Sequence, residues 1–408
     1  MGMILKRAAA LALAMFAAAG LSARTISVAE YKERMIAGWI GQIAGVVWGA
    51  PTEFKFKGVI APDSALREWT PAMINEGFDQ DDLYVEMTFI ETLDKYGLTV
   101  DIRQAGIDFA NTQYKLWCAN AAGRTNLRKG IAPPDSSHPA FNRYATAIDY
   151  QIEADFSGLI SPGCPQRVLE LGNLFGRLMN YGDGVYGGQF VGGMYAEAFF
   201  ETNRVKIVEA GLACIPQESL YAQMVRDMLK WYRNDPKDWK LAWRCAKAKW
   251  RENPEYQKLA SGDIDVKING AMVLLGFLWG EGDPENTIRI SARGGYDSDC
   301  NPSSAAGVLF TSLGLKNIPA KYYTALDRSK KFSFTAYDFP SLIEVCERLA
   351  RKVVLKEGGK IRKDSNGKEI FIIPQNAPAP DGYDIAWAPV RPEGCRYTPE
   401  ERARIRAK

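Results

Sequence analysis

Apolar stretches with helical spacing alternate with short polar segments along most of the chain. Residues 29–50 are apolar at nearly every position, as is typical of a buried central helix. Glycines recur there every three or four residues. On a helix they form one narrow stripe, which predicts close approach of another backbone. The stripe consists of Gly38, Gly41, Gly45 and Gly49. Helical spacing also marks residues 82–97, 165–181, 192–202, 218–235, 239–253, 269–282, 302–314 and 339–355. The pattern predicts an all-α fold, a compact helical bundle.

The hydrophobic pattern changes towards the C-terminus. Residues 359–374 place apolar positions on both sides of Asn366-Gly367, a pair typical of a two-residue hairpin turn. Residues 375–394 are rich in proline and glycine. We therefore expect residues 24–350 to form the helical domain and residues 351–408 a small β-containing extension that packs on it or covers a rim.

The first 23 residues have the pattern of a secretory signal peptide. Lys6 and Arg7 precede an apolar run from Ala8 to Leu21, which is short for a membrane span, and Ala23 offers a small residue for cleavage. An uncleaved N-terminal anchor is the alternative. A cleaved signal peptide predicts an exported protein, periplasmic or extracellular. No membrane span is expected after cleavage, because no other stretch reaches about 18 uninterrupted apolar residues.

The composition is that of a globular protein with balanced charge. The 408 residues are 47% hydrophobic and 24% charged, and 51 basic against 48 acidic side chains give a net charge of +3. No lysine- or arginine-rich tract is present. The charge pattern therefore argues against nucleic acid as a partner.

Histidine and cysteine usage restricts the kinds of site that the chain can build. His138 is the single histidine and lies in a proline-rich segment, so a multi-histidine metal site is excluded and a Ser-His-Asp triad would depend on this residue alone. The seven cysteines form no C-x-x-C pair, which argues against a cysteine zinc site. A catalytic metal would need oxygen ligands, which favours magnesium, manganese or calcium. We expect no catalytic role for His138.

Acidic side chains gather where apolar helices are predicted to start or stop. One adjacent pair precedes the helix near residue 82 and a second pair precedes the helix near residue 302, while a single acid follows the glycine-striped helix. Helix capping is one explanation. Two neighbouring acids exceed what a cap requires, and their repulsion raises a pKa unless a cation neutralises them. The pattern predicts an oxygen-ligated metal site, dinuclear if all four aspartates contribute. These acids are Glu53, Asp81, Asp82, Asp297 and Asp299.

Three segments carry a resemblance to a known family. "GQIAGVVWGAPTEF" (41–54), "QDDLYVEM" (80–87) and "GGYDSDCNPSSAAG" (294–307) resemble the signature blocks of the ADP-ribosylglycohydrolase family, in the same order and at fitting distances. The resemblance implies a helical bundle of that type, Mg²⁺ as cofactor with two ions bound, or Mn²⁺ in its place, and hydrolysis of a glycosidic bond in a small-molecule or glycosyl substrate.

The resemblance also implies roles for individual residues. Glu53 and Asp82 match catalytic acids, and the metal shell comprises Gln80, Asp81, Asp82, Asp297, Asp299 and Cys300. Gln80 and Cys300 stand where the family has threonine. Leu83 and Val46 also depart from the family pattern, and Tyr296 is inserted after the paired glycines.

Two glycine-containing segments, 154–165 and 182–193, resemble parts of the family that line the substrate cleft. Through them the resemblance implies substrate contacts from Asp155, Gly184, Tyr186, Gly187 and Gly188. A flexible loop is the alternative for residues 182–193.

The expected function is metal-dependent cleavage of an N- or O-glycosidic bond in an ADP-ribosyl or related sugar substrate. Three alternatives stay open: an exported glycosidase for a sugar other than ADP-ribose, a catalytically inactive sugar- or nucleotide-binding protein on the same scaffold, and an interaction protein that binds through its β tail. The oligomeric state stays open as well.

Overall fold

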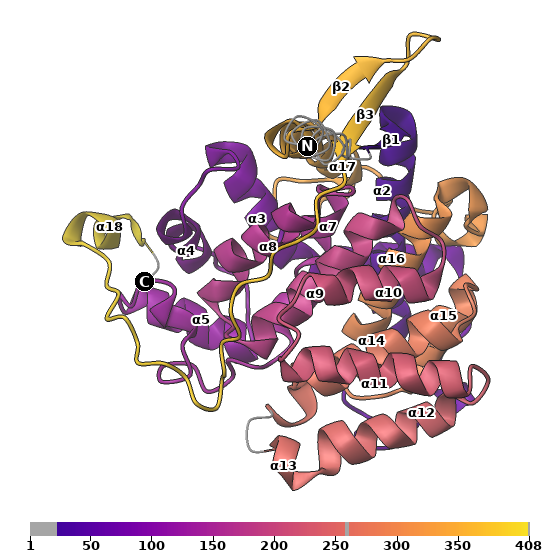
Figure 1. Cartoon of the computed structure of the whole chain (residues 1–408), viewed down its shortest axis with the longest axis horizontal. Coiled ribbons are helices and arrows are strands. Elements are labelled where there is room, and N and C mark those ends of the chain that lie inside the picture. The colour runs from indigo at the N-terminus through magenta and orange to yellow at the C-terminus, as the bar shows by residue number, and fades with distance from the viewer. Residues whose placement is uncertain (1–22, 258–260, 407–408) are drawn as a thin grey trace, which may run out of the picture.

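A computed structural model describes residues 23–257 and 261–406 and confirms a mostly helical fold with a small sheet at one end (Figure 1). The strands are β1 (Ala23–Ser27), β2 (Lys360–Lys363) and β3 (Glu369–Pro374). The helices are α2 (Val28–Gly49), α3 (Asp81–Tyr96), α4 (Ile102–Ala110), α5 (Cys118–Arg128), α6 (Asp149–Ile152), α7 (Asp155–Leu159), α8 (Pro165–Phe175), α9 (Asp183–Ala198), α10 (Arg204–Ala213), α11 (Leu220–Asn234), α12 (Trp239–Ala246), α13 (Pro254–Gln257), α14 (Val266–Trp279), α15 (Pro284–Arg293), α16 (Cys300–Leu313), α17 (Phe339–Lys356) and α18 (Pro399–Arg404). The signal peptide expected at residues 1–23 lies outside the described residues, apart from Ala23. No helix in the described ranges is long and apolar enough to cross a membrane.

The glycine stripe of α2 packs against the backbone of α16. A Cβ built on Gly41 would lie 2.5 Å from the Ala306 carbonyl oxygen, and one on Gly45 would lie 2.5 Å from the Pro302 carbonyl carbon. Because the contacts of α2 move towards the start of α16 as α2 proceeds, the two helices run antiparallel. The predicted close approach is confirmed, and it brings the end of α2 beside the beginning of α16.

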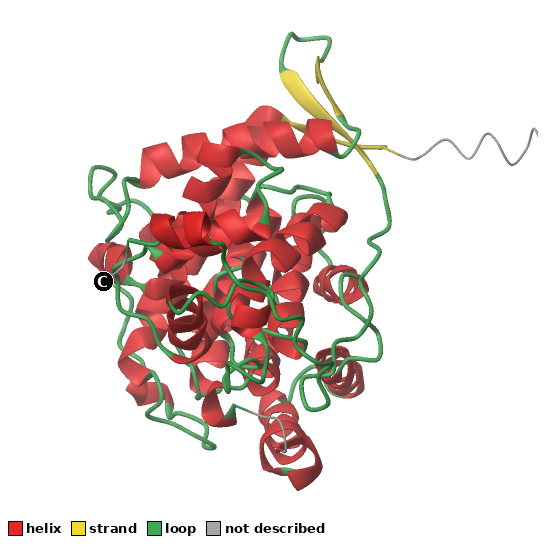
Figure 2. Cartoon of the chain, turned by 90° about the vertical axis from the view of Figure 1, so that its left-hand side faces the viewer, coloured by secondary structure: helices red, strands yellow, loops and turns green. Residues whose placement is uncertain are grey.

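The β extension takes its third strand from the other end of the described chain. The sheet order is β1-β3-β2 with both pairs antiparallel, and buried Ile26 of β1 lies opposite buried Phe371 of β3. Figure 2 shows the strands at one end of the helical body. The predicted hairpin is present, but its loop spans residues 364–368 instead of two residues. Asp364 Oδ1 accepts the N–H groups of both Asn366 and Lys368 and so closes the wider turn.

One further boundary differs from that expected from the sequence. The domain boundary predicted at residue 351 falls inside α17, because the apolar face of that helix continues through buried Val353 and Val354. The segment after β3 then runs along the helical body to α18 (Figure 1). The carboxylate of Asp135 holds it by accepting three consecutive N–H groups, those of Glu393, Gly394 and Cys395.

Candidate metal and catalytic site

One cavity of about 280 Å³, called the acidic cavity below, opens beside the starts of α3 and α16. It is lined by carboxylates and by aromatic and aliphatic side chains. The lining comprises Glu53, Phe54, Asp79, Gln80, Asp81, Tyr84, Trp117, Cys118, Asn120, Ile148, Asp149, Ile152, Ile264, Asp297 and Cys300. Residues of all three sequence blocks therefore meet in one place, although more than 200 positions separate the first block from the last.

The helix ends position these acids. The antiparallel contact of α2 with α16 sets the turn after α2, which carries Glu53, against the loop that precedes α16. Thr52 Oγ1 and Ser298 Oγ hydrogen-bond across this junction at 2.8 Å, and the N–H of Phe54 donates to the Tyr296 carbonyl oxygen at 2.9 Å. Asp81 begins α3, with Gln80 immediately before it. Three segments therefore contribute carboxylates to the cavity: the turn after α2, the start of α3 and the loop before α16.

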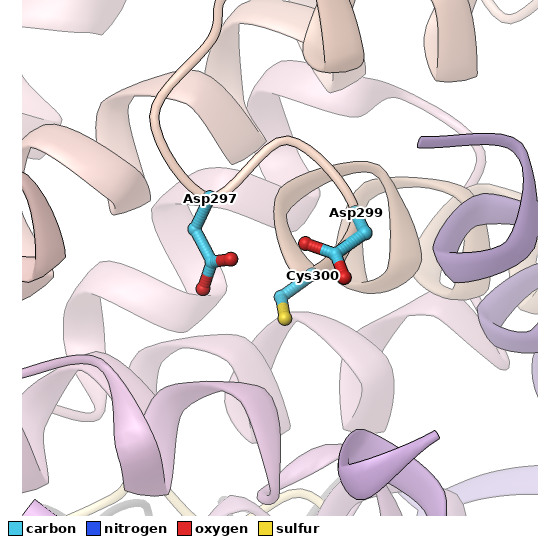
Figure 3. Close-up of side chains that lie close together, drawn as sticks. All are labelled: Asp297, Asp299 and Cys300. Carbon is cyan, nitrogen blue, oxygen red and sulfur yellow. The ribbon is translucent and has the colours of Figure 1, made fainter. Parts of the chain in front are cut away.

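Asp297, Asp299 and Cys300 form the tightest cluster of the site. One ligand atom from each lies within 4.8 Å of the other two, and each of the three residues is buried (Figure 3). The Cys300 thiol donates to Asp82 Oδ1 at 3.0 Å. Asp82 and Asp299 are therefore part of the same cluster, although neither contributes to the lining of the acidic cavity.

Two carboxylate oxygens of this cluster have no hydrogen-bond partner among the described residues. They are Asp82 Oδ2 and Asp299 Oδ1, on side chains that are 0% and 4% exposed. A buried charge without a partner is costly, whereas a bound cation would satisfy both oxygens. The residues present therefore fit a divalent metal held by oxygen ligands.

Burial and mutual repulsion shift the pKa values of these acids upward. Burial, with the nearby charges of Asp299 and Asp81, raises the pKa of Glu53 to about 7. Burial and the charge of Asp299 raise the pKa of Asp81 to about 6. The pKa values of Asp82 and Asp297 lie well above the usual range for the same two reasons, burial first and neighbouring carboxylates second. A cation would reverse this balance by favouring the ionised forms.

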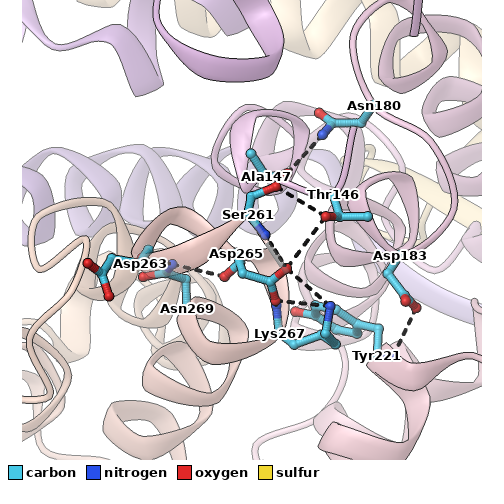
Figure 4. A network of polar contacts seen from close by, with 10 residues as sticks. All are labelled: Thr146, Ala147, Asn180, Asp183, Tyr221, Ser261, Asp263, Asp265, Lys267 and Asn269. Atoms are coloured by element: carbon cyan, nitrogen blue, oxygen red, sulfur yellow. Dashed lines mark hydrogen bonds and ion pairs between the residues drawn. The ribbon is translucent and has the colours of Figure 1, made fainter. Parts of the chain in front are cut away.

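A buried polar network supports the loop that carries Asp297. Asn269 Oδ1 accepts the backbone N–H of Asp297 at 3.2 Å and the side-chain amide of Asn301 at 2.9 Å. The Asn269 amide donates to the carbonyl oxygens of Asp263 and Asp265, each at 3.0 Å (Figure 4). Asn269 therefore ties the metal-site loop to the segment that precedes α14.

Asp155 lies behind the cluster, not in the cavity lining. It begins α7 and is fully buried, and its carboxylate accepts the hydroxyls of Tyr195 at 2.8 Å and Ser304 at 3.3 Å. Burial raises its pKa to about 7. The substrate contact that the resemblance implied for Asp155 is not provided in this arrangement, since two hydroxyls of α9 and α16 occupy its oxygens.

The glycines expected to line the cleft belong to the interior of α9. Gly184, Gly187 and Gly188 face other side chains, and a Cβ on Gly188 would overlap the ring of Tyr150. The Tyr186 hydroxyl contacts the C-terminal segment by accepting the N–H of Asp384 at 2.7 Å. None of the four lines the acidic cavity. Helix packing explains these glycines, and the flexible loop considered for residues 182–193 is wrong.

Several lining residues were not identified from the sequence. Trp117 is 46% exposed at the cavity, and Asp149 is 5% exposed with Oδ2 unpartnered among the described residues. Burial raises the pKa of Asp149 to about 7. Glu153, one helical turn after Asp149, is completely buried and accepts the side-chain amide of Asn120. The available signal was the set of acids within the otherwise apolar residues 145–160.

His138 takes part in the packing of the C-terminal segment. Its Nε2 hydrogen-bonds with the Val390 carbonyl oxygen at 2.8 Å, and its Nδ1 accepts the N–H of Ala140 at 3.1 Å. His138 is absent from the lining of the acidic cavity.

Comparisons with known proteins identify a similar fold and a family. A solved structure described as an ADP-ribosylglycohydrolase-related protein complex shares the fold with a TM-score of 0.51 and 17% sequence identity, over 79% of this chain and 99% of that one. No curated protein matches the chain. The sequence model of the ADP-ribosylglycohydrolase family matches residues 27–359, a range that includes every acid of the cavity. The chain therefore belongs to the ADP-ribosylglycohydrolase family.

Proposed function

We propose that this protein is a metal-dependent hydrolase of glycosidic bonds, with the acidic cavity as its active site. Membership of the family supports a glycohydrolase-type function and a small-molecule substrate. One observation carries the proposal of metal dependence: carboxylates from three distant segments converge, and two of their buried oxygens have no partner among the described residues.

Asp81, Asp82, Asp297 and Asp299 would hold the metal, with Gln80 and Cys300 beside them. Mg²⁺, or Mn²⁺ in its place, would polarise the sugar hydroxyls and the attacking water and stabilise developing charge. The chain orients these acids rigidly, because Asp81 and Asp82 begin α3, and Asp297 and Asp299 immediately precede α16. Preorganised carboxylates lose little entropy when a cation binds.

Glu53 is the favoured general base. It lines the cavity and its side chain is exposed, so water has access to its carboxylate. Asp82, the other catalytic candidate, is 0% exposed, and its Oδ1 already accepts the Cys300 thiol. The geometry therefore favours Glu53 for the proton transfer and Asp82 for holding the metal.

The lining favours an uncharged glycoside over an ADP-ribosyl compound. Phe54, Tyr84 and Trp117 offer aromatic faces for a flat leaving group or a sugar ring. No lysine, arginine or histidine is among the lining residues of this described cavity, so a diphosphate would meet several carboxylates without a compensating side-chain cation. Two lysines lie beside lining residues: the Nζ of Lys115 is 5.0 Å from the ring centroid of Trp117, and the Nζ of Lys57 is 5.5 Å from that of Phe54.

A paired hydrolysis assay tests the proposal. ADP-ribosyl compounds, nucleosides and aryl glycosides are incubated with the protein in Mg²⁺ and, separately, in chelator. We expect turnover only with metal and faster turnover of the uncharged substrates. Binding of a sugar or nucleotide without any turnover would instead support the inactive binding protein, and the absence of both would support an interaction protein.

Export is a separate proposal that is supported by the pattern of residues 1–23. It fits a substrate taken from outside the cytoplasm better than an intracellular ADP-ribosylated protein. Fractionation of cells that express the full chain tests it, since a retained cytoplasmic location of uncleaved protein would contradict it.

A further inference from the structure

A sulfur atom lies among the carboxylates of the proposed metal site. Cys300 is the first residue of α16 and is 4% exposed. Its Sγ and the carboxylates of Asp297 and Asp299 form the cluster in which all ligand atoms lie within 4.8 Å of one another (Figure 3). Within residues 23–257 and 261–406, no other group of three or more histidine, cysteine, aspartate or glutamate side chains meets this spacing.

The oxygens next to the sulfur point independently to a ligand. Asp299 Oδ1 and Asp82 Oδ2 lack partners among the described residues, and both side chains are more than nine-tenths buried. Asp82 Oδ1, by contrast, accepts the Cys300 thiol at 3.0 Å. The sulfur and the free oxygens therefore belong to one cluster, and a cation that binds these oxygens lies within reach of the thiol.

The sulfur changes which cation suits this site. Mg²⁺ is a hard ion that prefers oxygen ligands and retains several waters, whereas a thiolate selects ions of the zinc type. A threonine at this position, as the family pattern has it, would offer only a hydroxyl oxygen.

We propose that Cys300 is a metal ligand through Sγ and that the site binds a thiophilic divalent cation, of the Zn²⁺, Co²⁺ or Cd²⁺ type, more tightly than Mg²⁺. The proposal rests on the metal site proposed above and adds the identity of one ligand and the class of ion. Binding forms one metal–sulfur bond and breaks the S–H bond of Cys300, whose proton passes to the buffer. No electron is transferred, so no oxidant or reductant is required.

Metal titration of the metal-free full-length protein tests the proposal without an activity assay. Cd²⁺ and Co²⁺ are added separately while the ultraviolet charge-transfer absorption of a metal–thiolate bond is followed. Competition with Mg²⁺ gives the relative affinities. We expect a saturable thiolate band and an affinity for Cd²⁺ that exceeds that for Mg²⁺ by on the order of 100-fold.

Two serine variants separate the site thiol from the other cysteines. Cys300→Ser keeps an oxygen at the position, so it should abolish the saturable band and lower the Cd²⁺ affinity by on the order of 10-fold to 100-fold, with Mg²⁺ binding retained. Cys118→Ser is the matched control, since Cys118 lines the same cavity but lies outside the cluster. It should keep both the band and the affinity. Circular dichroism establishes that both variants are folded.

The outcomes distinguish this inference from the proposed function. A band of full amplitude in Cys300→Ser, or equal affinities for Cd²⁺ and Mg²⁺ in the unmodified chain, would overturn the inference. If Mg²⁺ binds and supports turnover without any thiolate band, the ligand assignment fails while the hydrolase proposal stands. If neither ion binds to the folded protein, both proposals fail together.

Discussion

Several carboxylates at the acidic cavity lie in surroundings that favour their protonated forms. Burial and the charge of Asp299 raise the pKa values of Glu53 and Asp81, and burial with the charges of Asp81 and Asp299 raises that of Asp82. These residues differ, however, in their exposure to solvent. Glu53 faces the solvent at the mouth, while Asp82 and Asp299 lie in the interior. Access to water therefore separates Glu53, the proposed general base, from Asp82 and Asp299, which are proposed to hold an ion.

Replacement of Glu53 by glutamine tests its proposed role as general base. The amide keeps the size of the side chain but cannot accept a proton, so turnover should fall roughly 100-fold or more while substrate affinity changes far less. Turnover and binding are measured separately on this variant. Wild-type turnover would remove Glu53 from the mechanism, and weakened binding with unchanged turnover would make it a positioning residue.

The substitution Asp299→Asn tests the proposed role of Asp299 as a metal ligand. An amide oxygen is a weaker ligand for a hard dication than a carboxylate oxygen, although the volume is nearly the same. We expect metal affinity, measured by calorimetry, to fall by on the order of 10-fold or more, and metal-dependent activity to be lost. The urea midpoint of the metal-free protein should not fall, since the change removes a repelled buried charge. Unaltered Mg²⁺ binding would contradict the assignment of Asp299 as a ligand.

At the scale of elements, the contact between α2 and α16 determines where the acids lie. The glycine stripe lets the two backbones approach so closely that side chains at these positions would not fit. The turn that carries Glu53 and the loop that carries Asp297 are both direct continuations of this pair. A change in the helix contact is therefore expected to reach the metal site.

Gly45→Ala tests this dependence. The new Cβ would meet the Pro302 carbonyl carbon and the Ser303 nitrogen at 2.5 Å, and backbone atoms cannot rotate away. We expect a loss of about 3 kcal/mol in the free energy of unfolding, measured in urea, together with weaker Mg²⁺ binding. The control is Gly382→Ala, because a Cβ there meets no atom within 4 Å and should change stability by less than about 0.5 kcal/mol.

The sequence predicted features whose signal is local. The paired acids at two helix starts and the glycine stripe of α2 each lie within a few consecutive turns, so their spacing alone indicated a metal site and a close helix contact. Trp117 was not identified because its segment has no unusual local pattern, and Asp149 was not identified although acids stand out within the otherwise apolar residues 145–160. Only the three-dimensional arrangement brings them to the acids.

The glycines of α9 left two interpretations open. Frequent glycine lowers helix propensity, so a flexible loop was the alternative to a cleft-lining segment for residues 182–193. Tertiary packing overrides that preference, because Tyr150 and the helices around α9 fill the space that glycine leaves. The family resemblance added an expected contact with substrate. In the fold these residues face the protein interior.

At the scale of the whole molecule, the metal-free protein carries several buried acids that lose solvation on folding. Burial raises the pKa values of Asp149 and Asp155 to about 7, above the value of about 4 in the unfolded chain. A raised pKa means that the folded state binds more protons than the unfolded state between these values. The stability contributed by the protonated forms is complete below about pH 4 and is lost as pH rises through about 7.

We therefore expect these two acids to lower the free energy of unfolding of the metal-free protein as pH rises from 5 to 8. Asp155→Asn should flatten this dependence, because an amide can still bond with the hydroxyls of Tyr195 and Ser304 without taking a charge. Urea unfolding at several pH values in the presence of chelator measures this pH dependence for the unmodified protein and for Asp155→Asn. An Asp155→Asn profile parallel to that of the unmodified protein would show that Asp155 does not contribute.

The antiparallel contact of α2 with α16 also has a consequence for how the chain folds. Its partners, such as Gly41 and Ala306, lie far apart in sequence, and the strand pair of Ile26 with Phe371 spans an even longer stretch. Such pairings require closure of long loops before they contribute any contact free energy. During synthesis, α2 cannot pack against α16 until most of the polypeptide has been made. We expect a C-terminal truncation before α16 to remain unfolded by circular dichroism and refolding of the full chain to be slow for a helical protein. The acidic cavity would then be among the last parts to assemble, so metal binding at the proposed site would mark a chain that has completed its fold.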